Sequence, residues 1–382
     1  SHSAILARAL EIPAVLSVEG VASSLKNGDT VVVDGSEGAV IVNPDDNTVA
    51  EYSKKRDAFL AERKELENYR GRETKSASGE VYELFCNIGK PEDAVKAVDA
   101  DGEGVGLFRT EFLFMDRTSI PTEDEQFEAY KKAALILKGK SLIIRTLDIG
   151  GDKGIPYLGL EKEENPFMGF RAIRYCLKNR ELFKSQIKAI LRASAFGDIK
   201  IMFPLITTMD ELREGKKLVA ECKADLRNMG INFNENIQVG VMVETASAAV
   251  IADMLAKEAD FFSIGTNDLT GYTMACDRGN NDVSYLYSPL QPSVLRMIKR
   301  TIECGVQNGI SVGMCGEAAA NKLMIPLLIS FGLTEFSVSA PSVLNVRKII
   351  STWTKEEADK VTAKVLEMST QQEIVEYLKS VV

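Results

Sequence analysis

The chain has 382 residues, of which 45% are hydrophobic and 26% are charged, and its formal net charge is −9. This length can bury the cores of two or three domains, while the acidic balance argues against a dominant nucleic-acid-binding or acidic-membrane surface. A single histidine, His2, excludes a multi-histidine metal site and disfavours a Ser/His/Asp triad. Six scattered cysteines without a C-x-x-C pair, and no apolar run of 18 residues, predict a cytoplasmic protein with free thiols and no membrane insertion.

Residues 1–44 are too few to form a domain of their own. After a short helical segment, apolar runs at residues 31–33 and 40–42 flank a glycine-containing turn, which predicts a β-hairpin. From residue 46 to about residue 72, dense charges carry aromatic and aliphatic residues at roughly helical spacing. We predict a long exposed helix that links two bodies, and we divide the chain into residues 1–44, 45–78 and 79–382.

Beyond this linker, short apolar runs alternate with amphipathic helical stretches. The runs are YELFCNIG (82–89), VGLFRTEFLF (105–114), SLIIRTLDIG (141–150), IKIMFPLI (199–206), IQVGVMVET (237–245), DFFSIGTNDL (260–269), ISVGMCGE (310–317) and EFSVSA (335–340). Eight strands alternating with helices predict an α/β fold with a parallel (β/α)₈ barrel, and an open doubly wound sheet is the alternative. The barrel is favoured because polar residues fall late in the runs: Arg109, Arg145, Glu244, Asn267, Asp268 and Glu317.

In a parallel barrel the carboxyl ends of the strands converge on one face, which holds the active site. Glu244 in VMVETA and Asp268 in GTNDLT end consecutive strands, so their carboxylates should lie side by side. Two hard oxygen ligands without histidine or thiolate suit Mg²⁺ or Mn²⁺. The competing interpretation is that each carboxylate only caps a helix or pairs with a barrel arginine.

Arginines form the other half of the expected site. Arg109, Arg145 and Arg278 should converge on the same mouth, and three guanidinium groups there would clamp a phosphate or a carboxylate. A lone arginine in a strand is more often a salt-bridge partner, but three beside two carboxylates favour a phosphorylated anionic substrate. Cys315, in GMCGE, faces this mouth; a buried cysteine is usually inert, yet a thiol here could deliver a proton.

Taken together, these motifs resemble a known family. SHSAILARALEIPAV, GLFRTEFLFMDR, RTLDIGGDK, ENPFMGFRAIR, IMFPLI, VMVET, FFSIGTNDLTGYTMACDRGN and MCGE occur in the order and spacing found in enzyme I of the bacterial phosphoenolpyruvate-dependent sugar phosphotransferase system. The resemblance covers nearly the whole chain. It implies a TIM barrel preceded by a helical linker and the tail of a swivelling phosphohistidine domain, so we expect the chain to be a fragment of a longer protein.

The resemblance also implies roles for the site residues. Phosphoenolpyruvate would bind Mg²⁺ held by Glu244 and Asp268, and its phosphate and carboxylate would be gripped by Arg109, Arg145, Asn267 and Arg278. Cys315 would protonate the enolpyruvate. His2 would accept the phosphoryl group and pass it to a histidine-containing phosphocarrier protein for sugar uptake, and the family's barrel domain forms homodimers.

The chain departs from the family pattern in places. Gly271 stands where a side-chain amide is usual, and GEAAANKLM differs from the common GEMAGDE, which puts the turnover rate in doubt. Two alternatives stay open. The first is a relative such as pyruvate phosphate dikinase or phosphoenolpyruvate synthase, and the second is a non-catalytic phosphoenolpyruvate-binding or dimerisation module.

Overall fold

The computed structural model describes residues 12–16, 18, 20–115, 117–150 and 155–382. The chain divides into two compact units, residues 1–68 and residues 69–382. Within the part that is described, no helix is long and apolar enough to cross a membrane.

The first unit contains the predicted hairpin and the predicted long helix. A short helix, α2 (Val21–Ser24), precedes strands β1 (Val31–Asp34) and β2 (Ala39–Val42), which pair antiparallel. Helix α3 (Asp46–Leu66) follows and ends in the 3₁₀ turn η1 (Glu67–Tyr69). The Asp45 side chain caps α3 by accepting a hydrogen bond from the Thr48 backbone N–H, and α3 has no buried residue, as its charge pattern predicts.

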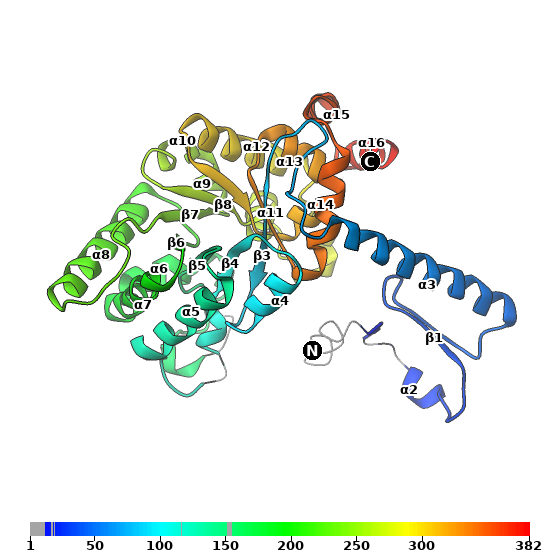
Figure 1. Ribbon diagram of the computed structural model, residues 1–382, viewed down its shortest axis with the longest axis horizontal. Coiled ribbons are helices and arrows are strands. Elements are labelled where there is room, and N and C mark those ends of the chain that lie inside the picture. The colour runs from blue at the N-terminus through cyan, green and yellow to red at the C-terminus, as the bar shows by residue number, and fades with distance from the viewer. Residues whose placement is uncertain (1–11, 17, 19, 116, 151–154) are drawn as a thin grey trace. The chain divides into compact units, whose positions relative to one another are not determined.

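The second unit contains a closed barrel of eight parallel strands, which confirms the predicted (β/α)₈ fold and excludes the open sheet (Figure 1). The strands, in chain order, are β3 (Glu83–Ile88), β4 (Gly104–Arg109), β5 (Ser141–Arg145), β6 (Ile199–Phe203), β7 (Val239–Val243), β8 (Phe261–Ile264), β9 (Ser311–Met314) and β10 (Glu335–Val338). Each neighbour along the chain is a neighbour in the sheet, and β10 closes the ring on β3. Seven of the predicted runs contain a whole strand, and the run 105–114 contains all of β4 but its first residue, Gly104.

Helices surround the barrel, as Figure 1 shows. They are α4 (Asp93–Asp99), α5 (Glu123–Leu137), α6 (Ala172–Lys178), α7 (Arg180–Ala193), α8 (Met209–Asn228), α9 (Ala246–Val250), α10 (Ala252–Leu255), α11 (Thr266–Met274), α12 (Pro292–Gln307), α13 (Ile325–Phe331), α14 (Val343–Thr352), α15 (Lys355–Glu367) and α16 (Gln371–Val381). Threonines 122, 208, 354 and 370 each begin one of them in a capping box with a glutamate three residues later.

Two hydrophobic cores position the site. The larger core packs the outer faces of the strands against the helices, and a smaller one combines side chains from β4 to β8 with Cys315, which follows β9. Because both faces of these strands are buried, the sequence shows continuous apolar runs rather than alternation. At the amino-terminal end of β10, Glu335 is buried beside Gly106 and Gly313, where an added Cβ would lie within 3 Å of its Oε1 atom.

Candidate active site at the carboxyl ends of the strands

Three carboxylates meet where strands β5, β7 and β8 end. Asp148 follows β5, Glu244 follows β7, and Asp268 lies in the first turn of α11 after β8. One oxygen atom of each side chain lies within 4.8 Å of the others. The structure therefore brings together Glu244 and Asp268, as the sequence predicts, and adds Asp148.

Local backbone geometry holds Glu244 in place. Its Oε1 atom accepts a hydrogen bond of 2.7 Å from the backbone N–H of Leu205, and Leu205 has a left-handed backbone with φ of 55°. Gly265 leaves room for the carboxylate, because an added Cβ would lie 2.8 Å from Glu244 Oε2. A left-handed non-glycine residue is strained, and such strain is concentrated at functional sites.

Burial and mutual repulsion perturb these carboxylates. The pKa of Glu244 is raised to about 8, first by burial and then by the charges of Asp268 and Asp148. The pKa of Asp268 is also raised, first by burial, although Arg171 opposes the rise. A nearby cation stabilises the ionised form of such carboxylates, because its positive charge offsets the cost of burial and the repulsion between them.

Two arginines lie between the carboxylates and create a chain of alternating charges. Arg145 pairs with Glu111 at 2.6 Å and with Asp148 at 3.0 Å. Arg171 pairs with Asp148 at 2.7 Å and with Asp268 at 3.2 Å. We call the six residues Glu111, Arg145, Asp148, Arg171, Glu244 and Asp268 the mouth cluster.

Arg109 and Arg278 lie beside this cluster in different states. Arg109 ends β4 opposite Arg145 on β5, and its side chain makes no hydrogen bond or ion pair with any residue that the structure describes. The pKa of Arg109 is lowered first by burial and then by Arg145, with a contribution from Arg278, so these two arginines each lie close enough to repel Arg109. Arg278 is exposed and pairs with Glu317 at 2.8 Å. An anion placed among the three would relieve this repulsion.

Of the remaining predicted residues, Cys315 lies in the interior of the barrel and Asn267 lies in the first turn of α11. Cys315 is buried, its Sγ atom is 3.7 Å from the Ile264 carbonyl oxygen, and burial raises its pKa to about 11. Asn267 precedes Asp268, and its carbonyl oxygen accepts a hydrogen bond of 2.8 Å from the Tyr287 hydroxyl. His2 lies outside the residues that the structure describes.

Comparison with known families decides the assignment. A family model described as "PEP-utilising enzyme, PEP-binding domain", where PEP is phosphoenolpyruvate, matches residues 63–354, and a second, "PEP-utilising enzyme, mobile domain", matches residues 1–38. The chain belongs to the PEP-utilising enzymes. The first match contains every member of the mouth cluster, and the second contains His2.

Two curated relatives of this PEP-utilising chain carry the same name. It is 51% identical over 379 residues to a phosphoenolpyruvate-protein phosphotransferase of Bacillus subtilis and 48% identical over 379 residues to one of Staphylococcus carnosus. These alignments cover 99% of this chain and 66% of each relative, so the chain spans about two thirds of their length. Among solved structures, a citrate lyase β subunit from M. tuberculosis is 15% identical, and the match covers 74% of this chain and 99% of that chain. Its TM-score of 0.38 is too low to support a structural or functional assignment.

Three members of the mouth cluster were not predicted from the sequence. Asp148 lies three residues after Arg145, and Glu111 lies two residues after Arg109, so the rule that polar residues follow strands could have found both. Arg171 lies at the start of α6, far from any strand end, and only the fold brings it to the mouth. In this PEP-utilising chain the site is thus richer in paired charges than its sequence indicates.

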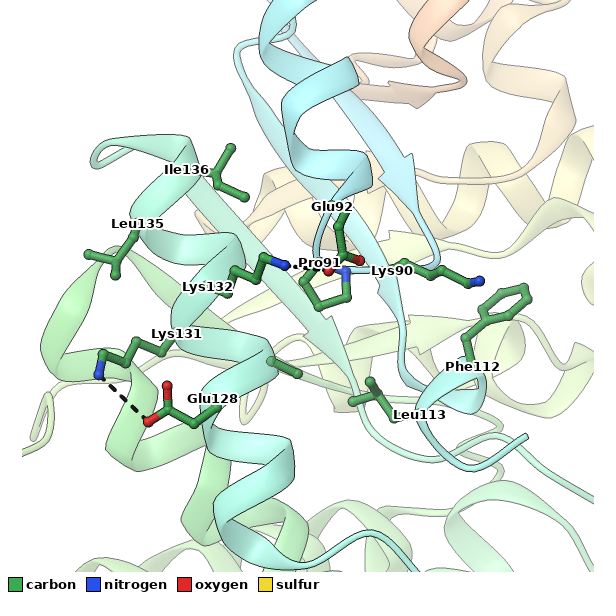
Figure 2. Close-up of a pocket in the computed structure, with 11 residues that line it drawn as sticks. Lys90, Pro91, Glu92, Phe112, Leu113, Glu128, Lys131, Lys132, Leu135 and Ile136 are labelled. Atoms are coloured by element: carbon green, nitrogen blue, oxygen red, sulfur yellow. Dashed lines mark hydrogen bonds and ion pairs between the residues drawn. The ribbon is translucent and has the colours of Figure 1, made fainter. Parts of the chain in front are cut away.

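A cavity of about 890 Å³ lies apart from these residues. It is lined by residues 90–92 just before α4, by the 3₁₀ turn η2 (Thr110–Leu113) and by α5. Figure 2 shows Lys132 paired with Glu92 and Lys131 paired with Glu128 along it. No member of the mouth cluster lines the cavity. The cavity and the mouth cluster are therefore separate features of the barrel.

Proposed function

We propose that the chain carries out the phosphoenolpyruvate half of a phosphoenolpyruvate-protein phosphotransferase, binding PEP with a divalent cation at the mouth of the barrel. The proposal is supported by one observation: three carboxylates, two of them buried, converge at the strand ends, and Arg109 at the end of β4 has no hydrogen-bond or ion-pair partner among the described residues. A doubly charged anion that also binds a cation complements such a site. The family match and the names of the curated relatives support PEP as that anion.

Glu244 and Asp268 are the proposed ligands of the cation. The donor set fits a hard metal ion, because it consists of carboxylate oxygen atoms without histidine or thiolate, and burial leaves those carboxylates short of positive charge. Mg²⁺ is the proposed ion, and Mn²⁺ is the alternative. When bound, a divalent cation offsets the negative charge of the phosphate and of the enolate that develops as the phosphate leaves.

Arginine side chains grip the substrate in this proposal. Arg109, Arg145 and Arg278 would contact the phosphate and carboxylate of PEP, and Asn267 would add an amide. Arg171 joins them on geometric grounds, since it already bridges Asp148 and Asp268. The ion pairs of Arg145 and Arg171 hold their guanidinium groups in place before the substrate arrives, which lowers the cost of ordering them.

The chemical step has two proposed participants. An imidazole nitrogen of His2 attacks the phosphorus atom, the bond from phosphorus to the enol oxygen breaks, and the electron pair stays on the enolate. Cys315 then donates its thiol proton to the terminal carbon of the enolate, which gives pyruvate, and water restores the proton to sulfur. A thiol whose pKa is about 11 is protonated at neutral pH, so it is a proton donor rather than a nucleophile.

Further roles are proposed from the family resemblance of the sequence. The phosphorylated His2 would pass its phosphoryl group to a histidine-containing phosphocarrier protein and so to sugar uptake, and the barrel would form a homodimer. Residues 1–44 would belong to the swivelling phosphohistidine domain, in line with the mobile-domain match, and residues 45–78 would be its linker to the barrel at 79–382. Six free cysteines support a reducing cytoplasm.

Phosphate-labelled PEP tests this function directly. With Mg²⁺ and no nucleotide, we expect the full-length protein to release pyruvate and to acquire an acid-labile label that His2→Ala removes. Dependence of the label on adenine nucleotide would favour a dikinase or synthase, and binding of PEP without pyruvate release would favour the non-catalytic module. No Mg²⁺-dependent binding of PEP would overturn the proposal.

A further inference from the structure

Tyr272 makes two contacts that only its hydroxyl group can make. It lies on α11 four residues after Asp268, so both side chains are on one face of the helix. The Tyr272 hydroxyl donates a hydrogen bond to the Phe167 carbonyl oxygen, and Arg171 Nη1 lies 3.3 Å from the Tyr272 hydroxyl oxygen. A phenol has one hydrogen, so the hydroxyl oxygen must accept from the guanidinium. Burial raises the pKa of Tyr272 to about 12, which keeps that hydrogen in place.

Arg171 has three polar anchors at the mouth of the barrel. Asp148 Oδ1 accepts from Nε at 3.1 Å and from Nη2 at 2.7 Å, Asp268 lies 3.2 Å from Nη2, and Tyr272 accepts from Nη1. The guanidinium also lies over the Phe167 ring, with Cζ 5.6 Å from its centroid. The hydroxyl of Tyr272 therefore joins Arg171 to the segment that carries Phe167.

One of these anchors, Asp268, also has a second proposed role. Asp268 is a proposed metal ligand, and a carboxylate that turns to a divalent cation no longer holds the guanidinium as firmly. Asp148 and Tyr272 are the polar anchors that then remain, one at each side of the guanidinium. Without the Tyr272 hydroxyl, Arg171 Nη1 would lose its hydrogen-bond partner in the state in which the guanidinium binds the substrate anion.

We propose that Tyr272 is a positioning residue that keeps Arg171 directed at the substrate when Asp268 binds the metal. This inference rests on the proposed function, because it assumes that Asp268 binds a cation and that Arg171 contacts PEP. It assigns a part in substrate binding to a side chain that touches neither substrate nor metal. Its effect should therefore fall on the affinity for PEP and leave the affinity for the metal unchanged.

Tyr272→Phe removes the hydroxyl and keeps the ring. Tyr157→Phe is a matched control, because the Tyr157 hydroxyl also donates to a loop carbonyl oxygen, that of Phe114, and contacts no member of the mouth cluster. By calorimetric titration at saturating Mg²⁺, we expect Tyr272→Phe to weaken PEP binding about tenfold, the scale of one lost charge-assisted hydrogen bond. Tyr157→Phe should stay within about twofold of wild type, and Mn²⁺ affinity should stay within about twofold in both variants.

A double-mutant cycle separates positioning from a general loss of structure. In an Arg171→Lys background no Nη1 atom exists, so adding Tyr272→Phe should weaken PEP binding by less than about twofold more. Equal effects of Tyr272→Phe in both backgrounds would overturn the inference, and so would wild-type affinity of the single variant. If Tyr272→Phe gave no cooperative thermal transition, loss of Mn²⁺ binding together with PEP binding would show a structural role instead. Failure of the wild-type chain to bind PEP with Mg²⁺ would count against the proposed function itself.

Discussion

Each end of the barrel holds a buried glutamate. Comparing the two shows how a buried carboxylate in a binding site differs from one that is only buried. Glu244 at the carboxyl end and Glu335 at the amino end are both almost inaccessible, and the pKa of each is raised to about 8. For Glu244, charged groups from several strand ends share its surroundings. For Glu335, Gly106 and Gly313 line the space, and its Oε1 atom has no hydrogen-bond partner among the described residues.

The two carboxylates differ in the charged side chains that surround them. Burial alone raises a pKa and costs stability, whereas burial among convergent carboxylates and arginines creates a place where ions of both signs can bind. Glu335 is therefore an internal control for Glu244, because it is the same side chain and is similarly buried but lies outside the mouth cluster, with Glu83 and Lys200 as its charged neighbours.

The largest effect should come from removing a proposed metal ligand. We expect Glu244→Gln to lower Mg²⁺-dependent pyruvate formation by about two orders of magnitude, the scale observed when preorganised charge is lost at a transition state. Asp268→Asn should do the same. The control, Glu335→Gln, should stay within about threefold of wild type in a coupled assay for pyruvate. Equal losses in Glu244→Gln and Glu335→Gln would show that burial, and not the site, explains the effect.

Arg109 should show the next largest effect. Because its guanidinium lacks a partner among the described residues, Arg109→Met should weaken PEP binding by about tenfold or more and should not lower the melting temperature. Arg300→Met is the matched control, since Arg300 pairs with Asp253 on the exposed surface and should leave PEP affinity unchanged. Titration calorimetry and thermal melting give the two readouts. A large fall in melting temperature for Arg109→Met with normal PEP affinity would assign Arg109 a structural role.

Cys315 should separate binding from proton transfer. Cys315→Ala should bind PEP within about twofold of wild type, because the role proposed for the thiol is to protonate the enolate and not to bind the substrate anion. Pyruvate should appear more slowly in this variant, by about tenfold or more. The measurement is a single-turnover assay with calorimetric binding in parallel. A loss of affinity that equals the loss of rate would mean that Cys315 only packs the interior of the barrel.

The sequence predicts the barrel strands better than it predicts the residues of the site. The eight strands could be located because both faces of each are buried, but their ends could not, since 3₁₀ turns and helices begin directly after them: the run at 105–114 contains a strand that ends at Arg109. Glu244, Asp268 and Arg145 could be found from their positions at or just after the ends of strands. Arg171 could not, because the course of the segment before α6 places it, and no local pattern encodes that course.

The smallest effect concerns Glu335 and pH. Its pKa is raised from 4.5 to about 8, chiefly by burial, so the folded chain binds a proton more tightly than the unfolded chain does. Stability from this group is complete below pH 4.5 and is lost as the pH rises towards 8. Glu335→Gln should therefore gain melting temperature relative to wild type as the pH rises from about 5 to about 8, by a few degrees. A difference between the two melting temperatures that stays constant across this range would contradict the account.

The most direct test of the central claim is a crystal structure of the chain with PEP and Mn²⁺, in which the anomalous signal of manganese locates the ion. The account predicts a manganese peak between the carboxylates of Glu244 and Asp268, with the phosphate of PEP contacting Arg109 and Arg145. A peak elsewhere on the chain, or PEP bound away from the mouth cluster, would contradict it.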